Sequence, residues 1–361
     1  MDSIYAKVIK DNMTPNRKQK FVDSERCHDL LVKNFKPKYS DKNGMSYDEW
    51  KNKIKEKFLE VIGYDVIKEN ACPLNFEIEW EEDKEDHRLI RFTIESEVGE
   101  IVPCYLLIPK TGKKKYPVAI TMQGHSTGFH NSIGEPKYEV DFPGVGRVNF
   151  AEQAVKNGYI GLAIEQRGMG ERKAYTDSRS NDINCRWTYR VALALGRTLI
   201  GERIWDIQRV IDALVNFPEC DMDKIFITGN SGGGTISYYA TCLDDRLKFC
   251  APSCAFCPYA DSILALAHCG CNYLPGSYRY FEMQDLACLI APKNLILIAG
   301  SKDDIFPIEG VRKGFEKVKE IYAENGVLEN CKLVETPKDH WWCKDIVWKE
   351  INEVCKKLGW N

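Results

Sequence analysis

The chain reads Gly229-Asn230-Ser231-Gly232-Gly233-Gly234 directly after an apolar run at 224–229, and a helical run follows. This is G-x-S-x-G between a predicted strand and a predicted helix, the setting in which a serine is presented as a nucleophile. Glycines two before and two after the serine let the strand and the helix approach without a clash. Free amides at the N-terminus of the predicted helix 232–242 favour negative charge there. The motif therefore predicts a nucleophile at Ser231; the competing interpretation is a glycine-rich connection without chemistry.

Short apolar runs alternate with helical patterns from Pro117 onward. Continuous apolar strands that alternate with helices are typical of an open, mostly parallel sheet covered on both faces. Ligands bind such sheets at the carboxyl ends of the strands. The predicted strands are 117–122, 159–164, 224–229, 248–253, 294–299 and 331–335. The predicted helices are 149–157, 202–217, 232–242, 307–324 and 343–357.

A nucleophilic serine needs a base, and the base needs an acid that orients it. Hydrolases with this turn order the three groups as serine, acid and histidine. His340 follows the last predicted strand, where a loop should deliver the base, whereas His268 precedes the strand that would supply the acid. The turn after 294–299 offers Asp303 and Asp304; one of them is expected to be the acid and the other to cap the next helix.

The oxyanion formed during attack needs two amide donors. The amide of Gly232 supplies one, and the loop after 117–122 should supply the other. We assign the second donor to the amide of His125. His125 and His130 also raise the possibility of a metal site, but neither H-E-x-x-H nor another zinc spacing surrounds them. No metal and no cofactor are therefore expected.

The N-terminal region has a different pattern. A helix is predicted from about Ser46 to Ile62, with an S-x-x-E capping box at Ser46 and Glu49 and a stop at Gly63. Its single apolar stripe should pack on the main domain. Alternation at 90–94 and 99–108 indicates antiparallel edge strands. We predict a helical extension at 1–73 and a catalytic domain at 74–361.

Composition excludes several classes of protein. The 361 residues carry 50 Lys plus Arg against 53 Asp plus Glu, so the chain lacks the basic surface expected of a nucleic-acid binder. No stretch approaches the roughly 18 apolar residues of a membrane span. Fifteen cysteines without an export signal predict reduced thiols and a cytoplasmic protein.

Five of these cysteines lie close together in the sequence. C-x-x-C followed by C-x-C raises the question of a zinc site. Cysteines in an apolar strand more often behave as small buried hydrophobes, and the spacing matches no zinc-finger pattern. Buried thiols are the favoured interpretation, and a structural metal or a redox disulfide stays open. The five are Cys250, Cys254, Cys257, Cys269 and Cys271.

Four stretches together resemble α/β-hydrolases of the acetyl xylan esterase and cephalosporin-C deacetylase type, in the dienelactone hydrolase-like group. They span about 117–345, and they are Met122-Gln123-Gly124-His125, Glu165-Gln166-Arg167-Gly168-Met169-Gly170-Glu171-Arg172, the run from Gly196 through Trp205-Asp206 to Gly234, and Gly300 to Pro307. The resemblance implies the α/β-hydrolase fold and makes the first aspartate of the last stretch, Asp303, the acid. Two positions depart from the family pattern: Glu165 replaces its usual Asp, and Asp339 replaces its usual Gly. The Cys-Ser-Arg turn of glucuronoyl esterases is absent, and a Ser nucleophile argues against dienelactone hydrolysis by a Cys.

These features predict a serine carboxylic-ester hydrolase with the triad Ser231, Asp303 and His340. The resemblance implies acetyl or short-acyl esters, including acetylated sugars, as small-molecule substrates. The other interpretations are a prolyl oligopeptidase-like peptidase and a catalytically silent binding protein. Assembly into homo-oligomers stays open, and the segment 171–203 is a candidate lid. The candidate pocket walls, which also fit ordinary core positions, are Trp187, His268, Trp341 and Trp342.

Overall fold

The computed structural model describes residues 26–174 and 185–360. Its contacts divide the chain into two compact units, Met1–Lys36 and Pro37–Asn361. In the first unit the described residues form helix α2 (Arg26–Asn34). The second unit carries the sheet and every candidate site residue. The contacts divide the chain after Lys36, and the extension predicted to end at residue 73 stays a prediction.

Helix α3 (Tyr47–Ile62) explains why the second unit begins so early. The Ser46 hydroxyl accepts a hydrogen bond from the amide of Glu49, and Gly63 ends the helix with φ 70°. The four residues of the apolar stripe are buried. The Phe58 ring lies 5.5 Å from that of Tyr239 and 6.1 Å from that of Phe281. The predicted helix and its packing on the main domain are confirmed.

The described residues form one nine-stranded sheet in the order β1-β2-β3-β5-β4-β6-β7-β8-β9. The pairs from β1 to β5 are antiparallel, and those from β5 to β9 are parallel. The mostly parallel sheet and the antiparallel edge predicted from the sequence are both confirmed. The strands are β1 (Glu77–Asp83), β2 (His87–Glu97), β3 (Glu100–Pro109), β4 (Tyr116–Met122), β5 (Ile160–Ile164), β6 (Cys220–Asn230), β7 (Leu247–Ser253), β8 (Asn294–Gly300) and β9 (Cys331–Thr336).

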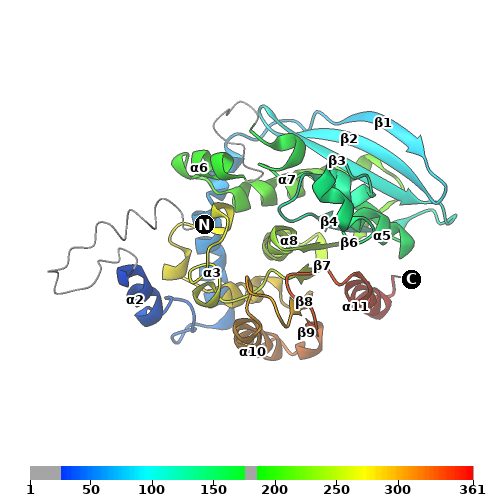
Figure 1. Ribbon diagram of the computed structural model, residues 1–361. Helices are drawn as coiled ribbons and strands as arrows, with labels where there is room; N and C mark the ends of the chain where they lie inside the picture. The colour runs from blue at the N-terminus through cyan, green and yellow to red at the C-terminus, as the bar shows by residue number, and fades with distance from the viewer. Residues whose placement is uncertain (1–25, 175–184, 361) are drawn as a thin grey trace. The chain divides into compact units, whose positions relative to one another are not determined.

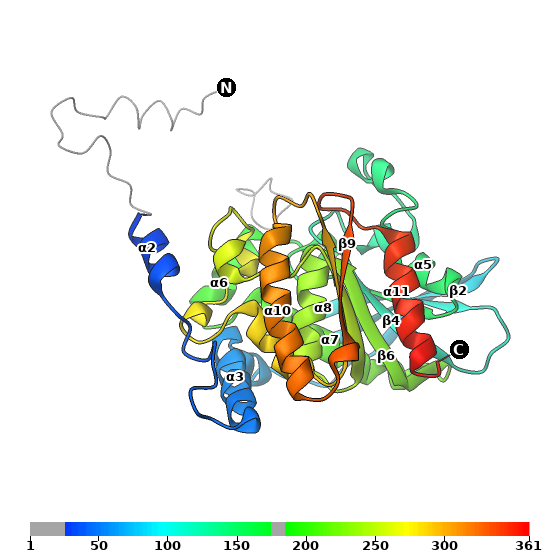
Figure 2. The same cartoon turned by 90° about the horizontal axis from the view of Figure 1, so that it is seen from below.

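Alternate residues of the central strands enter two separate cores, because successive side chains of a strand point to opposite faces. In β6, Ile225 and Ile227 join the larger core, whereas Phe226 joins the smaller one. Helices α7 (Leu199–Ala213), α8 (Gly232–Leu243) and α10 (Ile308–Glu324) cover the first face, and α5 (Phe150–Lys156) and α11 (Lys344–Lys357) cover the second (Figures 1 and 2). Both faces of the parallel strands are therefore buried, which explains their continuous apolar sequence.

Helices follow the strands as predicted, with small shifts at their ends. Helix α7 begins at Leu199, not at 202, because the Thr198 hydroxyl caps it by accepting from the amide of Gly201 at 3.0 Å. The remaining α-helices of the described residues are α4 (Tyr64–Lys68), α6 (Arg186–Ala194) and α9 (Ala287–Ile290). The 3-10 helices are η1 (Phe129–Ile133), η2 (Glu139–Gly144), η3 (Gly170–Arg172), η4 (Leu214–Asn216), η5 (Tyr259–Asp261), η6 (Gly270–Asn272), η7 (Ser277–Arg279), η8 (Met283–Leu286) and η9 (Leu328–Asn330).

A buried charge network joins the antiparallel strands to the parallel part of the sheet. Asp206 of α7 accepts from Arg167 at 2.7 and 2.9 Å and from Arg172 at 2.8 Å. It also accepts from the Ser96 hydroxyl of β2 at 2.6 Å. These arginines hold the pKa of Asp206 well below its usual range against the effect of burial. The network fixes the loop after β5, whose sequence supplied part of the family resemblance.

Among the described residues, no helix combines the length and apolar character needed to cross a lipid bilayer.

Candidate active site

The sheet reverses its winding at β4, whose neighbours are β5 on one side and β6 on the other. Strand β6 therefore begins the second direction of winding. In open α/β sheets, ligands bind outside the carboxyl ends of the strands at such a point. The loop after β4 carries Gly124 and His125, and the turn after β6 carries Ser231. The fold thus brings two of the predicted site segments to the same place.

Ser231 has the strained backbone that its motif predicts. Its φ of 56° and ψ of −126° lie in a region that non-glycine residues rarely adopt. A Cβ at Gly233 would lie 2.0 Å from the carbonyl oxygen of Met122, and one at Gly229 would lie 2.4 Å from it. The turn therefore requires glycine at both positions. The strain is maintained by this tight packing at the end of β4, and it presents the Ser231 hydroxyl at the sheet edge.

The loop after β4 lies directly against this turn. A Cβ at Gly124 would meet the carbonyl oxygen of Asn230 at 2.8 Å and the Cβ of Ser231 at 3.0 Å. The same atom would lie 3.5 Å from the amide nitrogen of Gly232. The backbone at His125 is therefore next to the two residues that follow β6. This position suits the expected oxyanion donors, whose assignment to Gly232 and His125 stays a prediction.

Asp303 and His340 form a hydrogen-bonded pair. The Nδ1 atom of His340 lies 2.8 Å from one carboxylate oxygen of Asp303. The other oxygen accepts from the amides of Ile305 and Phe306 at 2.9 and 3.0 Å. Burial raises the pKa of Asp303, but these hydrogen bonds outweigh it and hold the pKa below its ordinary value. Asp303 is buried and stays ionised beside the imidazole, whereas Asp304 is exposed.

Ser231 and His340 line one cavity of about 350 Å³. The Nε2 atom of His340 is buried and makes no hydrogen bond to any described residue, so the bond that would join it to the serine is not formed here. Such bonds are often long without substrate and shorten when it binds. The structure therefore brings the three predicted triad residues to one rim, with the base facing the cavity of the nucleophile.

The four candidate pocket walls lie outside the residues that line this cavity. Trp342 is 1% exposed and donates from Nε1 to Gln153 at 3.0 Å, so it is a core residue. Trp341 is 39% exposed and stacks on the Arg147 guanidinium, 3.7 Å from its ring centroid. Trp187 of α6 is 41% exposed and lines a separate hollow of about 370 Å³. The sequence could not tell these settings apart, because Trp suits each of them.

His268 reaches the triad indirectly. Its Nε2 lies 3.0 Å from the Ser262 hydroxyl, and its ring packs at 5.3 Å on Phe306. Phe306 in turn stacks on His340 at 5.9 Å. Burial lowers the pKa of His268. It is therefore a supporting residue behind Phe306, outside the cavity.

The segment 126–149 supplies polar cavity residues that the sequence did not reveal. Thr127, Asn131, Asp141 and Arg147 line the cavity with Ser231. Asp141 holds the segment together, because it accepts from the amides of Lys137 and Tyr138 at 3.0 Å each. This segment lacks a strand or a long helix, so periodicity gives no signal there. Of the candidate lid at 171–203, residues 175–184 lie outside the described residues, and its role stays a prediction.

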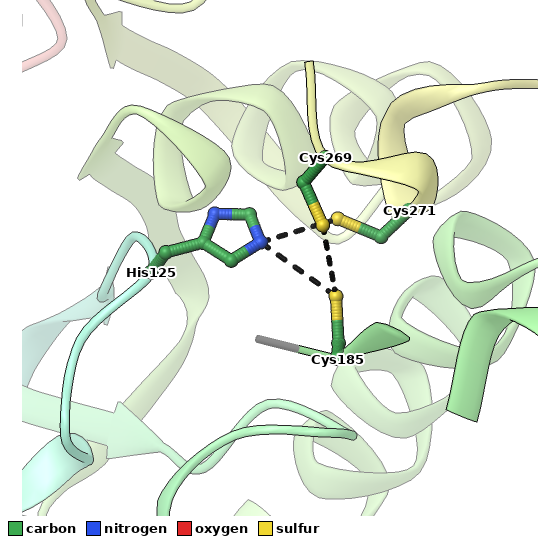
Figure 3. Close-up of side chains that lie close together, drawn as sticks. All are labelled: His125, Cys185, Cys269 and Cys271. Atoms are coloured by element: carbon green, nitrogen blue, oxygen red, sulfur yellow. Dashed lines mark hydrogen bonds between the residues drawn. The ribbon is translucent and has the colours of Figure 1, made fainter. Parts of the chain in front are cut away.

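The five cysteines that lie close together in the sequence divide into two groups. All fifteen are free thiols, and Cys250, Cys254 and Cys257 are buried as the favoured interpretation predicts. Cys269 and Cys271 instead approach His125 and Cys185 (Figure 3). The imidazole Nε2 of His125 lies within hydrogen-bond reach of the sulfurs of Cys185 and Cys271, at 3.6 and 3.4 Å. His125 and the pair Cys269 and Cys271 each raised the question of a metal in the sequence, but no local spacing joins them, because Cys185 is 60 residues from His125 and Cys271 is 146.

Comparison with known proteins identifies the family. A family model described as the Abhydrolase family matches residues 5–246, more than half of the chain. The chain belongs to the Abhydrolase family. A curated relative of this member is the "Putative hydrolase YtaP" of Bacillus subtilis, 23% identical over 272 residues, which cover 74% of this chain and 88% of the relative.

Solved structures agree with this Abhydrolase assignment at the level of the fold. One is described as a "putative acetyl xylan esterase" from Bacteroides fragilis, with a TM-score of 0.75, 16% identity, and coverage of 96% of this chain and 99% of the other. A glucuronoyl esterase from Teredinibacter turnerae has a TM-score of 0.62, 13% identity, and coverage of 96% and 94%. The α/β-hydrolase fold expected from the sequence is confirmed.

Proposed function

We propose that this protein is a serine carboxylic-ester hydrolase that works through an acyl-enzyme. The observation that carries the proposal is the 2.8 Å hydrogen bond between Asp303 and His340 at the rim of the cavity that also holds Ser231. A nucleophile, a base and a buried acid in this order are the parts that acyl transfer requires. The names of the structural relatives, an acetyl xylan esterase and a glucuronoyl esterase, support the same class of reaction.

The mechanism assigns one task to each residue. The Ser231 hydroxyl attacks the ester carbonyl carbon while Nε2 of His340 takes its proton. Asp303 holds the Nδ1 proton and stabilises the imidazolium. The amides of Gly232 and His125 donate to the oxyanion. Collapse of the tetrahedral intermediate expels the alcohol, which takes the proton from His340, and a water activated by the same imidazole then releases the acid.

The cavity favours a short acyl group and a polar alcohol. Its volume of about 350 Å³ is near the lower end of the range for small-molecule sites. Hydroxyl, amide, carboxylate and guanidinium groups line it from the segment 126–149, beside the apolar side chains of Val140, Pro143, Val148 and Phe150. The polar groups can hydrogen-bond a hydroxylated leaving group, and the small volume disfavours a long alkyl chain. An acetylated sugar fits both properties.

A matched pair of serine variants tests the proposal. p-Nitrophenyl acetate, butyrate and octanoate, acetylated xylooligosaccharides and a chromogenic peptide are offered to wild type, Ser231→Ala and Ser301→Ala. Ser301 is an exposed serine on the turn after β8. We expect hydrolysis of acetate and acetylated sugar by wild type and Ser301→Ala, with loss of roughly 10⁴-fold or more in kcat for Ser231→Ala.

Each other outcome removes a stated part of the proposal. Equal ester hydrolysis by Ser231→Ala and wild type rejects the triad. Equal turnover of octanoate and acetate rejects the short-acyl preference. Peptide cleavage without ester cleavage assigns the protein to the peptidases, and the absence of any hydrolysis favours a binding protein.

We also propose that the protein works in a reducing compartment, the cytoplasm. All fifteen cysteines are free thiols, and several are close enough together to oxidise. Thiol titration of the denatured protein, prepared from cells quenched with acid, should give fifteen reactive groups.

A further inference from the structure

Four side chains from three separate segments converge beside the cavity (Figure 3). His125 comes from the loop after β4, Cys185 precedes α6, and Cys269 and Cys271 flank Gly270 at the start of η6. Their ligand atoms, the three sulfurs and one imidazole nitrogen, all lie within 4.8 Å of one another. The imidazole Nε2 is 3.6 Å from the sulfur of Cys185 and 3.4 Å from that of Cys271, and the sulfurs of Cys185 and Cys269 are 3.3 Å apart.

These separations match the edges of a zinc coordination tetrahedron. Zinc binds sulfur at about 2.3 Å and imidazole nitrogen at about 2.0–2.1 Å, so the tetrahedral angle places two sulfurs about 3.8 Å apart and a sulfur and a nitrogen about 3.6 Å apart. The observed distances of 3.3–3.6 Å lie within about half an ångström of these values. They are far longer than a disulfide bond of about 2.05 Å.

We propose that His125, Cys185, Cys269 and Cys271 bind a zinc ion in a closed Cys₃His site. A set of three thiolates and one imidazole is a structural zinc set, with all four positions supplied by protein. The Nε2 atom of His125 points at the sulfurs in Figure 3, which is the orientation that a ligand requires. The geometry favours zinc over buried inert thiols, because thiols that serve only as hydrophobes need no imidazole nitrogen directed at them.

The surroundings supply the charge balance that such a site needs. Three thiolates, a neutral imidazole and Zn²⁺ have a net charge of −1. Arg203 of α7 is 2% exposed and hydrogen-bonds with Cys271. Its guanidinium also donates to the carbonyl oxygen of Arg167 at 2.7 and 3.2 Å, which fixes its position. A buried cation that donates to a metal-bound thiolate is the kind of outer contact that stabilises these sites.

The zinc site would join the start of α6 to the loop after β4 in the active site. The side chain of His125 would bind the zinc ion, and the backbone amide of the same residue is the proposed second oxyanion donor. A Cβ built at Gly232 would lie 3.5 Å from Nδ1 of the same ring. Zinc would therefore act as a positioning ion for the loop 123–125, without contact to the substrate. This consequence rests on the proposed function, whereas zinc binding itself does not.

Metal analysis of the full chain tests the site without reference to activity. The protein is purified under reducing conditions without chelator, and zinc is measured by plasma mass spectrometry in wild type, Cys269→Ser and Cys331→Ser. Cys331 matches Cys269 in being partly exposed, but it lies outside the cluster. We expect about one equivalent of zinc in wild type and Cys331→Ser, and a loss of most of it in Cys269→Ser.

Cobalt gives a second readout that does not depend on the folding of a variant. Wild type stripped of zinc and loaded with Co²⁺ should show the visible bands of a tetrahedral ion and a near-ultraviolet thiolate-to-cobalt band. The proposal is overturned if wild type holds only traces of zinc, both as purified and after reconstitution, and gives no cobalt spectrum. Zinc held equally by Cys269→Ser and wild type overturns this choice of ligands.

Ester hydrolysis separates the two proposals. If the protein binds zinc but has no esterase activity, the metal site stands and the proposed reaction is rejected. If it is an active esterase that binds no zinc, the proposed reaction stands and the metal site is rejected.

Discussion

The two adjacent aspartates in the turn after β8 differ in their exposure to solvent and in their hydrogen bonds. Asp303 is buried, accepts two backbone amides and holds Nδ1 of His340. Asp304 is exposed. An acid that orients an imidazole must be desolvated and fixed, because a solvated carboxylate neither selects a tautomer nor stabilises the imidazolium strongly. The sequence left the choice open until the family resemblance favoured the first residue.

Asn substitution at each position provides a matched pair. Asp303→Asn should lower kcat for ester hydrolysis by about 10³–10⁴-fold, because the amide favours the wrong tautomer of His340. Asp304→Asn should stay near wild type. Steady-state kinetics with p-nitrophenyl acetate, with folding checked by circular dichroism, measures both, and the reverse ranking would assign the acid to Asp304.

Candidate side chains can be selected from the sequence where a local motif fixes their position. Ser231 follows from a turn pattern within one strand-to-helix unit, and His340 and the pair of aspartates follow from their order after later strands; their catalytic roles stay a prediction. The surroundings of Trp187 and Trp342 were not predictable, because an aromatic side chain suits a core and a surface hollow equally. The metal-type cluster was also out of reach, because its ligands meet only after folding.

At the scale of elements, helix α3 was predicted almost to the residue. A capping serine, an apolar residue at every fourth position and a terminal glycine all agree. What the sequence could not supply was the domain to which the helix belongs. Its stripe packs through Phe58 against Tyr239 of α8 and against Phe281, which follow it by 181 and 223 residues along the chain.

Removal of the Phe58 ring should therefore destabilise the second unit as a whole. Phe58→Ala is expected to reduce the free energy of unfolding by about 3–5 kcal/mol, because the ring is fully buried between Tyr239 and Phe281. Lys55→Ala, exposed on the same helix, should change it by less than about 0.5 kcal/mol. Urea unfolding gives both values. A loss below about 1 kcal/mol for Phe58→Ala would mean that α3 is a separable extension.

At the scale of the whole molecule, several buried carboxyl groups favour their protonated form. Burial raises the pKa values of Glu165, Glu282 and Asp285 to about 7 each. The unfolded chain releases these protons near pH 4, so between about pH 4.5 and 7 the folded state binds more protons. Stability contributed by these groups is therefore present in acid and is lost as the pH rises toward 7.

Glu165→Gln isolates one of these contributions. The amide oxygen can still accept from the amides of Phe129 and Glu171, each 3.2 Å from the glutamate. The stability of wild type relative to this variant should fall by on the order of 1–3 kcal/mol between pH 5 and pH 7.5. Thermal and urea unfolding across this range measure the difference. A constant or rising difference would show that Glu165 is ionised throughout.

The order of the strands also belongs to the whole molecule. Buried apolar runs predicted which segments are strands, but β5 lies between β3 and β4, which no local pattern indicates. The division of the chain at residue 36 is likewise a property of packing. Local periodicity therefore specified the elements, and long-range burial specified their neighbours.

The carboxylate of Asp206 imposes a constraint on the history of the protein. It balances the positive charge of two buried arginines. Removal of one member of such a buried ion pair lowers the free energy of unfolding by about 3–5 kcal/mol. Loss of Asp206 would leave Arg167 with Glu97 and Glu202, and Arg172 with Glu100, so we expect it to be tolerated best when one of the two arginines is replaced in concert. Correlated substitution at these three positions is thus the evolutionary signature of this contact.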